Sequence, residues 1–129
     1  MMNREQLLRH IEEHYDADAE QPWRKYPLYT VFRHRSNQKW FALVMDIPRC
    51  KLGLPGAESI DVLNVKCDPF LIGSLQKDAG FYPAYHMSKT NWITIALDGS
   101  VEDDKLLWLL DLSFTATAPK KKTARKPRE

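Results

Sequence analysis

The stretch LYTVFRHRSNQKWFALVMDI, residues 28–47, contains two runs of β-forming side chains on either side of a polar turn. Aromatic and β-branched residues are frequent in residues 28–35 and again in residues 39–47, as is typical of strands. Residues 36–38, which are Ser, Asn and Gln, separate the two runs, and such residues favour turns. The spacing therefore predicts an antiparallel β-hairpin, which ends at Pro48 because proline has no N–H to donate to a strand ladder.

The segments around this hairpin predict three helices and further strands. Helical periodicity occurs in residues 4–15, after Asp68 and after Ser100, and strand-like runs occur in residues 60–67 and 92–97. The first helix is expected to stop near residues 16–18, and Gly80 is expected to end the second. This order of elements predicts an α+β fold with an antiparallel sheet of four to five strands and helices packed on one face. Alternation in the second hairpin strand predicts one face with Trp40, Ala42 and Val44, and another with Phe41, Leu43 and Met45.

Charge is distributed unevenly along the 129 residues. Residues 117–129 carry six basic side chains and one acidic side chain, whereas residues 1–116 carry thirteen basic and sixteen acidic ones. The first 116 residues have the length and apolar content of one domain. The remaining segment lacks periodicity, and Pro119 and Pro127 flank its charges, so it is predicted to be a disordered basic tail.

Several classes of protein lack support in this sequence. It has no run of 18 apolar residues and begins with a polar stretch, so we expect neither membrane attachment nor a signal peptide. Cys50 and Cys67 form no CxxC pair and are expected to remain thiols in the cytoplasm. No P-loop, GxGxxG or GxSxG motif is present. We therefore expect a cytoplasmic protein that is not an enzyme and has no cofactor.

Three motifs carry a family resemblance: LNVKCDP at residues 63–69, YHMSKTNWITIALDGSV at residues 85–101, and DLSF at residues 111–114. With the PW pair at residues 22–23 and the hairpin, they resemble the MmcQ/YjbR family over about residues 3–116. The resemblance implies an α+β fold similar to the frataxin-like CyaY type. It also implies DNA binding through a double-wing arrangement of hairpins. Phe114 departs from the family pattern, which usually has tyrosine at this position. Any function that the tyrosine hydroxyl performs in the family is therefore absent from this chain.

Two segments supply candidate nucleic-acid contacts. Basic side chains cluster at the hairpin tip, and a basic two-stranded ribbon can enter a DNA groove. In the second segment, residues 85–92, cationic, amide and aromatic groups could contact phosphates and stack on bases. The same aromatic residues could instead only pack against the sheet, and both readings stay open. The candidate residues are Arg33, Arg35, Lys39, Tyr85, His86, Lys89, Asn91 and Trp92.

The sequence HIEEH, residues 10–14, matches a short zinc-peptidase pattern that places two histidines on one side of a helix. No third ligand is evident on a following helix, so no metal site is expected. Carboxylates on the same helix invite comparison with the acidic ridge of frataxins, but Arg4 and Arg9 interrupt them.

These observations favour a small DNA-binding protein that contacts double-stranded DNA through the hairpin tip and residues 85–92, with added non-specific affinity from the tail. The alternative is a protein-interaction or adaptor module, because the body of the chain is mildly acidic. A third hypothesis is a small-ligand pocket between the sheet and Trp92. The sequence leaves the oligomeric state open.

Overall fold

The hairpin predicted from residues 28–47 is present at the centre of the fold. The structure is a computed structural model that describes residues 2–119. Its helices are α1 (Arg4–His14), η1 (a 3-10 helix, Arg49–Leu52), α2 (Pro69–Leu75) and α3 (Asp103–Thr117). Its strands are β1 (Ala17–Glu20), β2 (Thr30–His34), β3 (Trp40–Pro48), β4 (Ser59–Lys66), β5 (Phe81–Pro83) and β6 (Trp92–Ala96).

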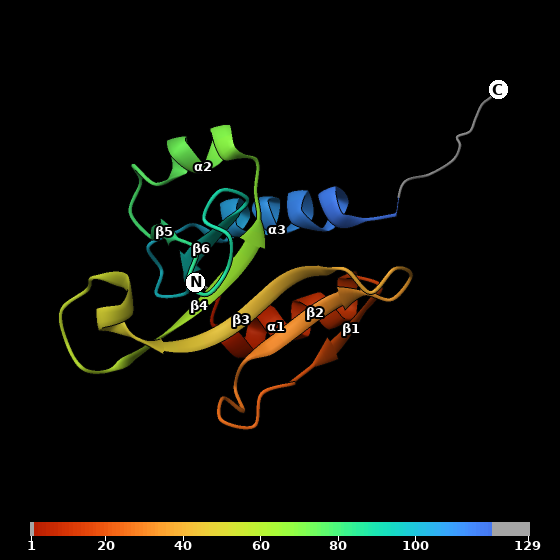
Figure 1. The fold of residues 1–129 in the computed structure, drawn as a ribbon, viewed down its shortest axis with the longest axis horizontal. Helices are drawn as coiled ribbons and strands as arrows, with labels where there is room; N and C mark the ends of the chain where they lie inside the picture. Colours follow the sequence, from red (N-terminus) through yellow and green to blue (C-terminus); the bar gives the residue numbers. More distant parts are fainter. Residues whose placement is uncertain (1, 120–129) are drawn as a thin grey trace.

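All six strands form one antiparallel sheet with the order β1-β2-β3-β4-β6-β5 (Figure 1). The α+β class is confirmed, and the sheet has six strands where four to five were predicted. The sequence pattern located neither β5, which has three residues, nor β1. Strand β1 has only four residues and two carboxylates. It forms because its backbone pairs with β2 along Ala17↔His34 to Glu20↔Val31, a long-range interaction that local propensity does not encode.

A β-bulge in the hairpin corrects the predicted faces of β3. Phe32 pairs with Ala42, but the next residue, Arg33, pairs with Trp40, so Phe41 is an extra residue on its strand. Phe41 therefore packs in the same buried cluster as Ala42, whereas Trp40 packs against the cluster that contains Leu43. The predicted assignment of Trp40 and Phe41 was wrong because strict alternation assumes a regular ladder.

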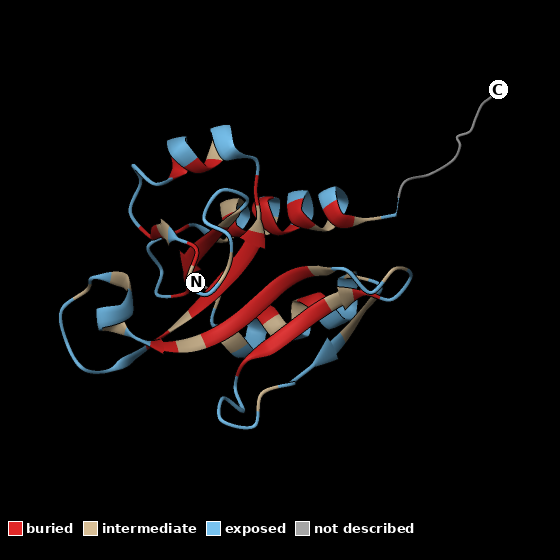
Figure 2. Cartoon of the chain, viewed as in Figure 1, coloured by how far each residue is buried: buried red, intermediate tan, exposed pale blue. Residues whose placement is uncertain are grey.

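The three α-helices pack on one face of the sheet, as predicted. Their buried side chains join those of the central strands in one cluster, and Figure 2 shows β2, β3 and β4 buried along most of their length. Asn3 begins α1 with a capping box, and Asp68 caps α2 by accepting a hydrogen bond from the Phe70 N–H. Helix residues in this cluster are Leu7, Ile11, Ile72, Leu75, Leu106, Leu109 and Leu110.

The opposite face of the sheet, called the helix-free face below, has its own buried apolar cluster. Strand residues such as Leu43, Met45 and Val62 form its base. Within residues 2–119, no α-helix packs on this face; Leu52 of η1 and side chains from loops, including Trp23 and Tyr85, pack over the cluster instead. Loops are less regular than helices, and they leave room for a cavity on this face.

Gly80 does not end α2, as the sequence predicted. The helix ends at Leu75, with Gln76 as its C-cap. Gly80 lies just before β5 with φ of +93°, and a Cβ atom there would lie 2.6 Å from the Val101 Cγ2 atom. The glycine is therefore explained by a left-handed backbone and close packing against the turn that precedes α3.

The last turn of α3 is joined to the hairpin. Thr117 is buried, its carbonyl oxygen accepts a hydrogen bond from Asn37 Nδ2 at 3.0 Å, and its Oγ1 atom lies 2.9 Å from His34 Nε2. Thr117 was assigned to the tail from sequence, but it belongs to the helix. The predicted disorder of the tail concerns mainly residues 120–129, which lie outside the described residues. Among residues 2–119, no helix combines the length and hydropathy needed to cross a bilayer.

Candidate functional site

Two buried polar side chains anchor the start of the 85–92 segment on the helix-free face. Asn64 on β4 donates from Nδ2 to the Tyr85 carbonyl oxygen at 2.9 Å. The Thr94 Oγ1 atom on β6 accepts the Tyr85 N–H at 3.0 Å and donates to Asn64 Oδ1 at 2.5 Å. Both side chains are fully buried, so the backbone of Tyr85 is fixed to the sheet from two strands.

Beyond Tyr85 the segment turns away from the sheet. His86 has φ of +64°, in the left-handed region that non-glycine residues seldom adopt, and its side chain is exposed. Exposed Lys89 donates to the Ala84 carbonyl oxygen at 3.1 Å. The Asn91 carbonyl oxygen accepts the Cys67 N–H at 2.8 Å, and half-buried Trp92 begins β6. The segment thus has packed ends and an exposed middle.

The hairpin cations differ in their partners. Arg33 forms an ion pair with Glu20, and its guanidinium carbon lies 5.6 Å from the centre of the Trp40 ring. Arg35 pairs with Asp16 at 2.8 Å and with Asp18 at 3.1 Å. Lys39 is exposed, and no carboxylate in residues 2–119 pairs with it.

The hairpin and the 85–92 segment meet at a cavity on the helix-free face, called the aromatic cleft below. Its volume is about 440 Å³, within the range of about 300–1,000 Å³ typical of small-molecule sites. Trp40 of the hairpin and His86 of the second segment are more than forty positions apart in the sequence, but they line the same cavity. The lining residues are Trp23, Tyr26, Tyr29, Trp40, Leu43, Met45, His86, Met87 and Ser88.

Aromatic rings form most of the cleft wall in a fixed arrangement. Trp23 makes edge-to-face contacts with Trp40, at 5.9 Å between ring centres, and with Tyr29, at 6.0 Å. Tyr26 stacks on Tyr29 at 4.6 Å and remains 48% exposed. Burial and the nearby Tyr85 raise the pKa of Tyr29 to about 12, so its phenol keeps its proton at neutral pH. The wall therefore offers aromatic surface and hydroxyl donors without a negative charge of its own.

Three exposed cations, called the rim cations below, are neighbours in sequence of the cleft residues. Arg24 and Lys25 lie at the tip of a turn closed by a hydrogen bond of 3.2 Å from the Tyr26 N–H to the Trp23 carbonyl oxygen. Lys39 directly precedes Trp40. None of the three pairs with a carboxylate in the described part of the chain. Each rim cation is thus next in sequence to a residue that lines the aromatic cleft, although none of the three lines it.

Comparison with known proteins shows to which family the chain belongs. The family model described as YjbR matches residues 12–116, which include β1–β6, α2 and nearly all of α3. The chain belongs to the YjbR family. Membership confirms the resemblance carried by the motifs at residues 63–69, 85–101 and 111–114.

Relatives of this YjbR protein occur in several bacteria. The uncharacterised protein YyaQ of Bacillus subtilis strain 168 is 39% identical over 117 residues, which cover 91% of this chain and 99% of YyaQ. The uncharacterised protein YjbR of Escherichia coli K12 is 33% identical over 58 residues, covering 44% of this chain and 49% of that protein.

Solved structures share the fold of this YjbR protein. A crystal structure of a Pseudomonas syringae protein superposes with a TM-score of 0.88 at 45% identity, covering 91% of this chain and all of that chain. A Deinococcus radiodurans crystal structure superposes with a TM-score of 0.70 at 22% identity, covering 98% of this chain and 83% of that chain, and shows likeness of fold.

Sequence reasoning missed the residues that build the cleft of this YjbR chain from its first loop. Trp23 and Tyr26 lie in a segment whose proline and polar residues indicate a loop, whereas Tyr29 was placed in the first hairpin strand. Their shared cavity arises only when the loop before β2 covers the sheet. Asn64 and Thr94 were also missed. They carried a signal, since each is a polar residue inside an apolar strand, and such a residue when buried needs a hydrogen-bond partner.

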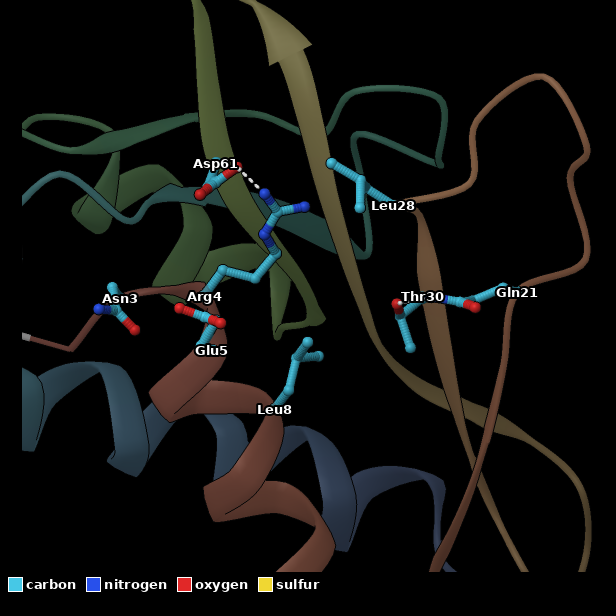
Figure 3. Close-up of a pocket in the computed structure, with 8 residues that line it drawn as sticks. All are labelled: Asn3, Arg4, Glu5, Leu8, Gln21, Leu28, Thr30 and Asp61. Atoms are coloured by element: carbon cyan, nitrogen blue, oxygen red, sulfur yellow. Dashed lines mark hydrogen bonds and ion pairs between the residues drawn. The ribbon is translucent and has the colours of Figure 1, made fainter.

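A second cavity, of about 340 Å³, lies on the helix side of this YjbR chain, near the start of α1. Figure 3 shows Arg4 extending toward Asp61, with which it forms an ion pair at 3.3 Å. Glu5 also lines this cavity, so its carboxylates outnumber its cations. This charge does not favour phosphate, in contrast to the rim of the aromatic cleft.

The remaining candidates from the sequence are the two histidines of α1, a pocket near Trp92 and the two cysteines. His10 and His14 stack at 4.2 Å, but no group of three potential metal ligands occurs within residues 2–119. Trp92 is not among the residues that line the aromatic cleft, so this cavity is not the pocket beside Trp92 that was expected from the sequence. Cys50 is exposed, Cys67 is buried, and both are free thiols.

Proposed function

We propose that this YjbR protein binds DNA through the helix-free face of its sheet and that it acts as a binding protein and not as an enzyme. The observation that carries the proposal is the convergence of the hairpin and the 85–92 segment on the aromatic cleft. Both segments were chosen from sequence for their cations and aromatic groups. Their meeting at one aromatic cavity, with three unpaired cations next in sequence to its lining residues, supports nucleic-acid binding.

The candidate cations differ in how available they are to bind a phosphate. Lys39 is free of carboxylates in residues 2–119 and exposed, so it is available for a phosphate. Arg35 is bound to two aspartates, and a phosphate would have to compete with both. The proposed contact surface is therefore centred on the aromatic cleft and the rim cations, and it includes Lys89 of the 85–92 segment. Arg35 is expected to contribute little.

Fluorescence anisotropy of a labelled DNA across a salt series tests this function. The measurement compares the full chain with a version that ends at Pro119, which retains Thr117 and its contacts with the hairpin. We expect the shortened chain to bind with an affinity that falls as salt rises, because its cations displace counterions from the phosphates. Binding by the full chain alone would assign the affinity to residues 120–129 and would contradict the proposal.

One observation favours a protein-interaction role as a second candidate. On α3, Trp108 and Leu112 are one helical turn apart and are 48% and 39% exposed. Exposed apolar pairs of this kind occur at protein interfaces. A protein partner that remains bound after nuclease treatment, and that Trp108→Ala releases, would support the adaptor role. Recovery of nucleic acid alone would count against it.

A further inference from the structure

We propose that the aromatic cleft receives an unpaired base, so that the DNA bound by this protein is a single strand. This inference rests on the proposed DNA-binding function and specifies the form of the ligand. It follows from the shape, the exposed surface and the charge of the cleft.

The cleft is concave and has an apolar base. Leu43 and Met45 form its floor and are at most 3% exposed. The side chains of Trp23 and Trp40 are half-buried at its wall, and each contacts the other edge-to-face. A flat aromatic ring that enters such a cavity gains contact on several sides, whereas a cation or a sugar hydroxyl gains much less from the apolar floor.

One ring of the wall is exposed enough to stack on a ligand. Tyr26 rests on Tyr29, with an angle of 20° between the ring planes, and 48% of its surface remains exposed. The stack holds Tyr26 in one orientation before any ligand binds. A preorganised aromatic ring of this kind stacks on bases of any sequence, because every base has a π-face.

Polar groups in the lining of the cleft can contact the edge of a base. His86 and Ser88 line the cleft, and within residues 2–119 neither the His86 ring nor the Ser88 hydroxyl has a hydrogen-bond partner. Their position depends on Tyr85, whose backbone is held by Asn64 and Thr94. The cleft therefore combines a stacking surface with free hydrogen-bonding groups.

Charge selects a nucleic-acid strand over a neutral aromatic ligand. Arg24 and Lys25 occupy the turn between Trp23 and Tyr26, and Lys39 precedes Trp40, so two separate segments each bring exposed cations next in sequence to residues of the aromatic wall. Phosphates on either side of an inserted base would lie near these cations. This alternation of aromatic and cationic groups is typical of proteins that bind single strands.

A duplex fits the same surface less well. Its bases are stacked and paired, and removing one from the stack costs a few kcal/mol. The hairpin tip, which would enter a groove of the duplex, presents Arg35 in ion pairs with Asp16 and Asp18. The structure therefore favours a strand whose bases are already unpaired.

The experiment uses the version that ends at Pro119 and compares a labelled single-stranded DNA of about ten nucleotides with the corresponding duplex. An RNA strand of the same sequence shows whether the sugar is recognised. We expect the single-stranded DNA to bind at least tenfold more tightly than the duplex. Tyr26→Ala should weaken single-strand binding by about five- to one-hundredfold, the usual effect of losing one stacked ring, and Tyr26→Phe should retain most of the affinity.

Trp108→Ala is the matched control, because Trp108 is also 48% exposed and lies on the helix side of the molecule. It should leave the affinity unchanged. Equal binding of duplex and single strand, or equal binding by Tyr26→Ala and the parent, would overturn base insertion while DNA binding itself stands. Absence of binding to both forms would overturn the proposed function and this inference together.

Discussion

The Ser113 hydroxyl on α3 donates a hydrogen bond of 2.6 Å to the carbonyl oxygen of Phe41, the extra residue of the β3 bulge. The Ser113 Oγ atom also accepts a hydrogen bond of 2.9 Å from the Lys66 N–H at the end of β4. One side chain thus bridges two neighbouring strands beyond the end of their ladder at Ala42↔Val65. It also fixes α3 to the sheet, which gives the DLSF motif a structural role.

Replacing Ser113 with Ala should lower the free energy of unfolding by about 1–3 kcal/mol, because a buried carbonyl of Phe41 and a partly buried N–H of Lys66 lose their partner. Urea denaturation followed by circular dichroism measures the change. Ser74→Ala, at an exposed position of α2, is the control and should alter stability by less than about 0.5 kcal/mol. A similarly small effect of Ser113→Ala would show that water or a backbone shift replaces the bridge.

Asn64→Ala should affect both stability and DNA binding. The change leaves the Tyr85 carbonyl oxygen without its partner and removes the acceptor of the Thr94 hydroxyl, so we expect a loss of about 1–3 kcal/mol. The released 85–92 segment should also weaken DNA binding, since His86 and Ser88 line the cleft. Asn91→Ala, at an exposed position, controls for stability. If Asn64→Ala bound DNA like the parent protein, anchoring of the segment would be irrelevant to binding.

Thr117→Val should destabilise the chain by about 1–3 kcal/mol, because His34 loses its hydrogen-bond partner. The Thr117 hydroxyl donates to the Ser113 carbonyl oxygen at 2.8 Å, so His34 Nε2 donates to Thr117 Oγ1. Thr115→Val introduces the same side chain at an exposed position of α3 and should have a much smaller effect. Urea denaturation compares the two, and equal values would contradict the role of this contact.

His34 should make stability depend on pH. Burial lowers its pKa below the ordinary value of 6.5, so the unfolded chain binds a proton more readily than the folded chain. Stability from this group is complete above pH 6.5 and decreases as the pH falls toward the lower pKa of the folded state. His10, whose pKa burial also lowers, acts in the same direction.

The test is urea denaturation between about pH 5 and 8, above the range in which ordinary carboxylates titrate. His34→Gln should lose part of the decrease in stability seen on acidification, and the remainder should persist because His10 is unchanged. An identical pH dependence in the parent and in His34→Gln would rule out His34 as its source.

Single cation replacements should alter the salt dependence of DNA binding according to their partners. Lys25→Gln removes a rim cation and should reduce the slope of log K against log salt by about 0.7 for a single strand. Arg35→Gln should change it less, because Arg35 is already bound to Asp16 and Asp18. Lys77→Gln, on the helix side of the chain, is the charge-matched control. Anisotropy titrations measure each slope, and an equal reduction in all three variants would indicate general electrostatic attraction without a defined surface.

Local pattern was sufficient for most elements of this fold. Residues 4–15 carry the apolar periodicity that predicts α1, and this signal involves neighbours within four positions. The hairpin is likewise specified by a polar turn between two β-rich runs, and the resemblance to the YjbR family rests on short motifs. These features were predicted because their causes lie close together in the chain.

Tertiary structure alone decided the rest. The Phe41 bulge exchanges the faces of Trp40 and Phe41, because Phe32 pairs with Ala42 while Arg33 pairs with Trp40. Arg35 was proposed from the sequence to contact nucleic acid, but it forms an ion pair with Asp18 of β1, a strand for which the sequence gives no local signal. The aromatic cleft likewise joins residues from three distant segments. Such outcomes depend on pairings whose free energy comes from burial and long-range hydrogen bonds, and a linear pattern of side chains does not contain those distances.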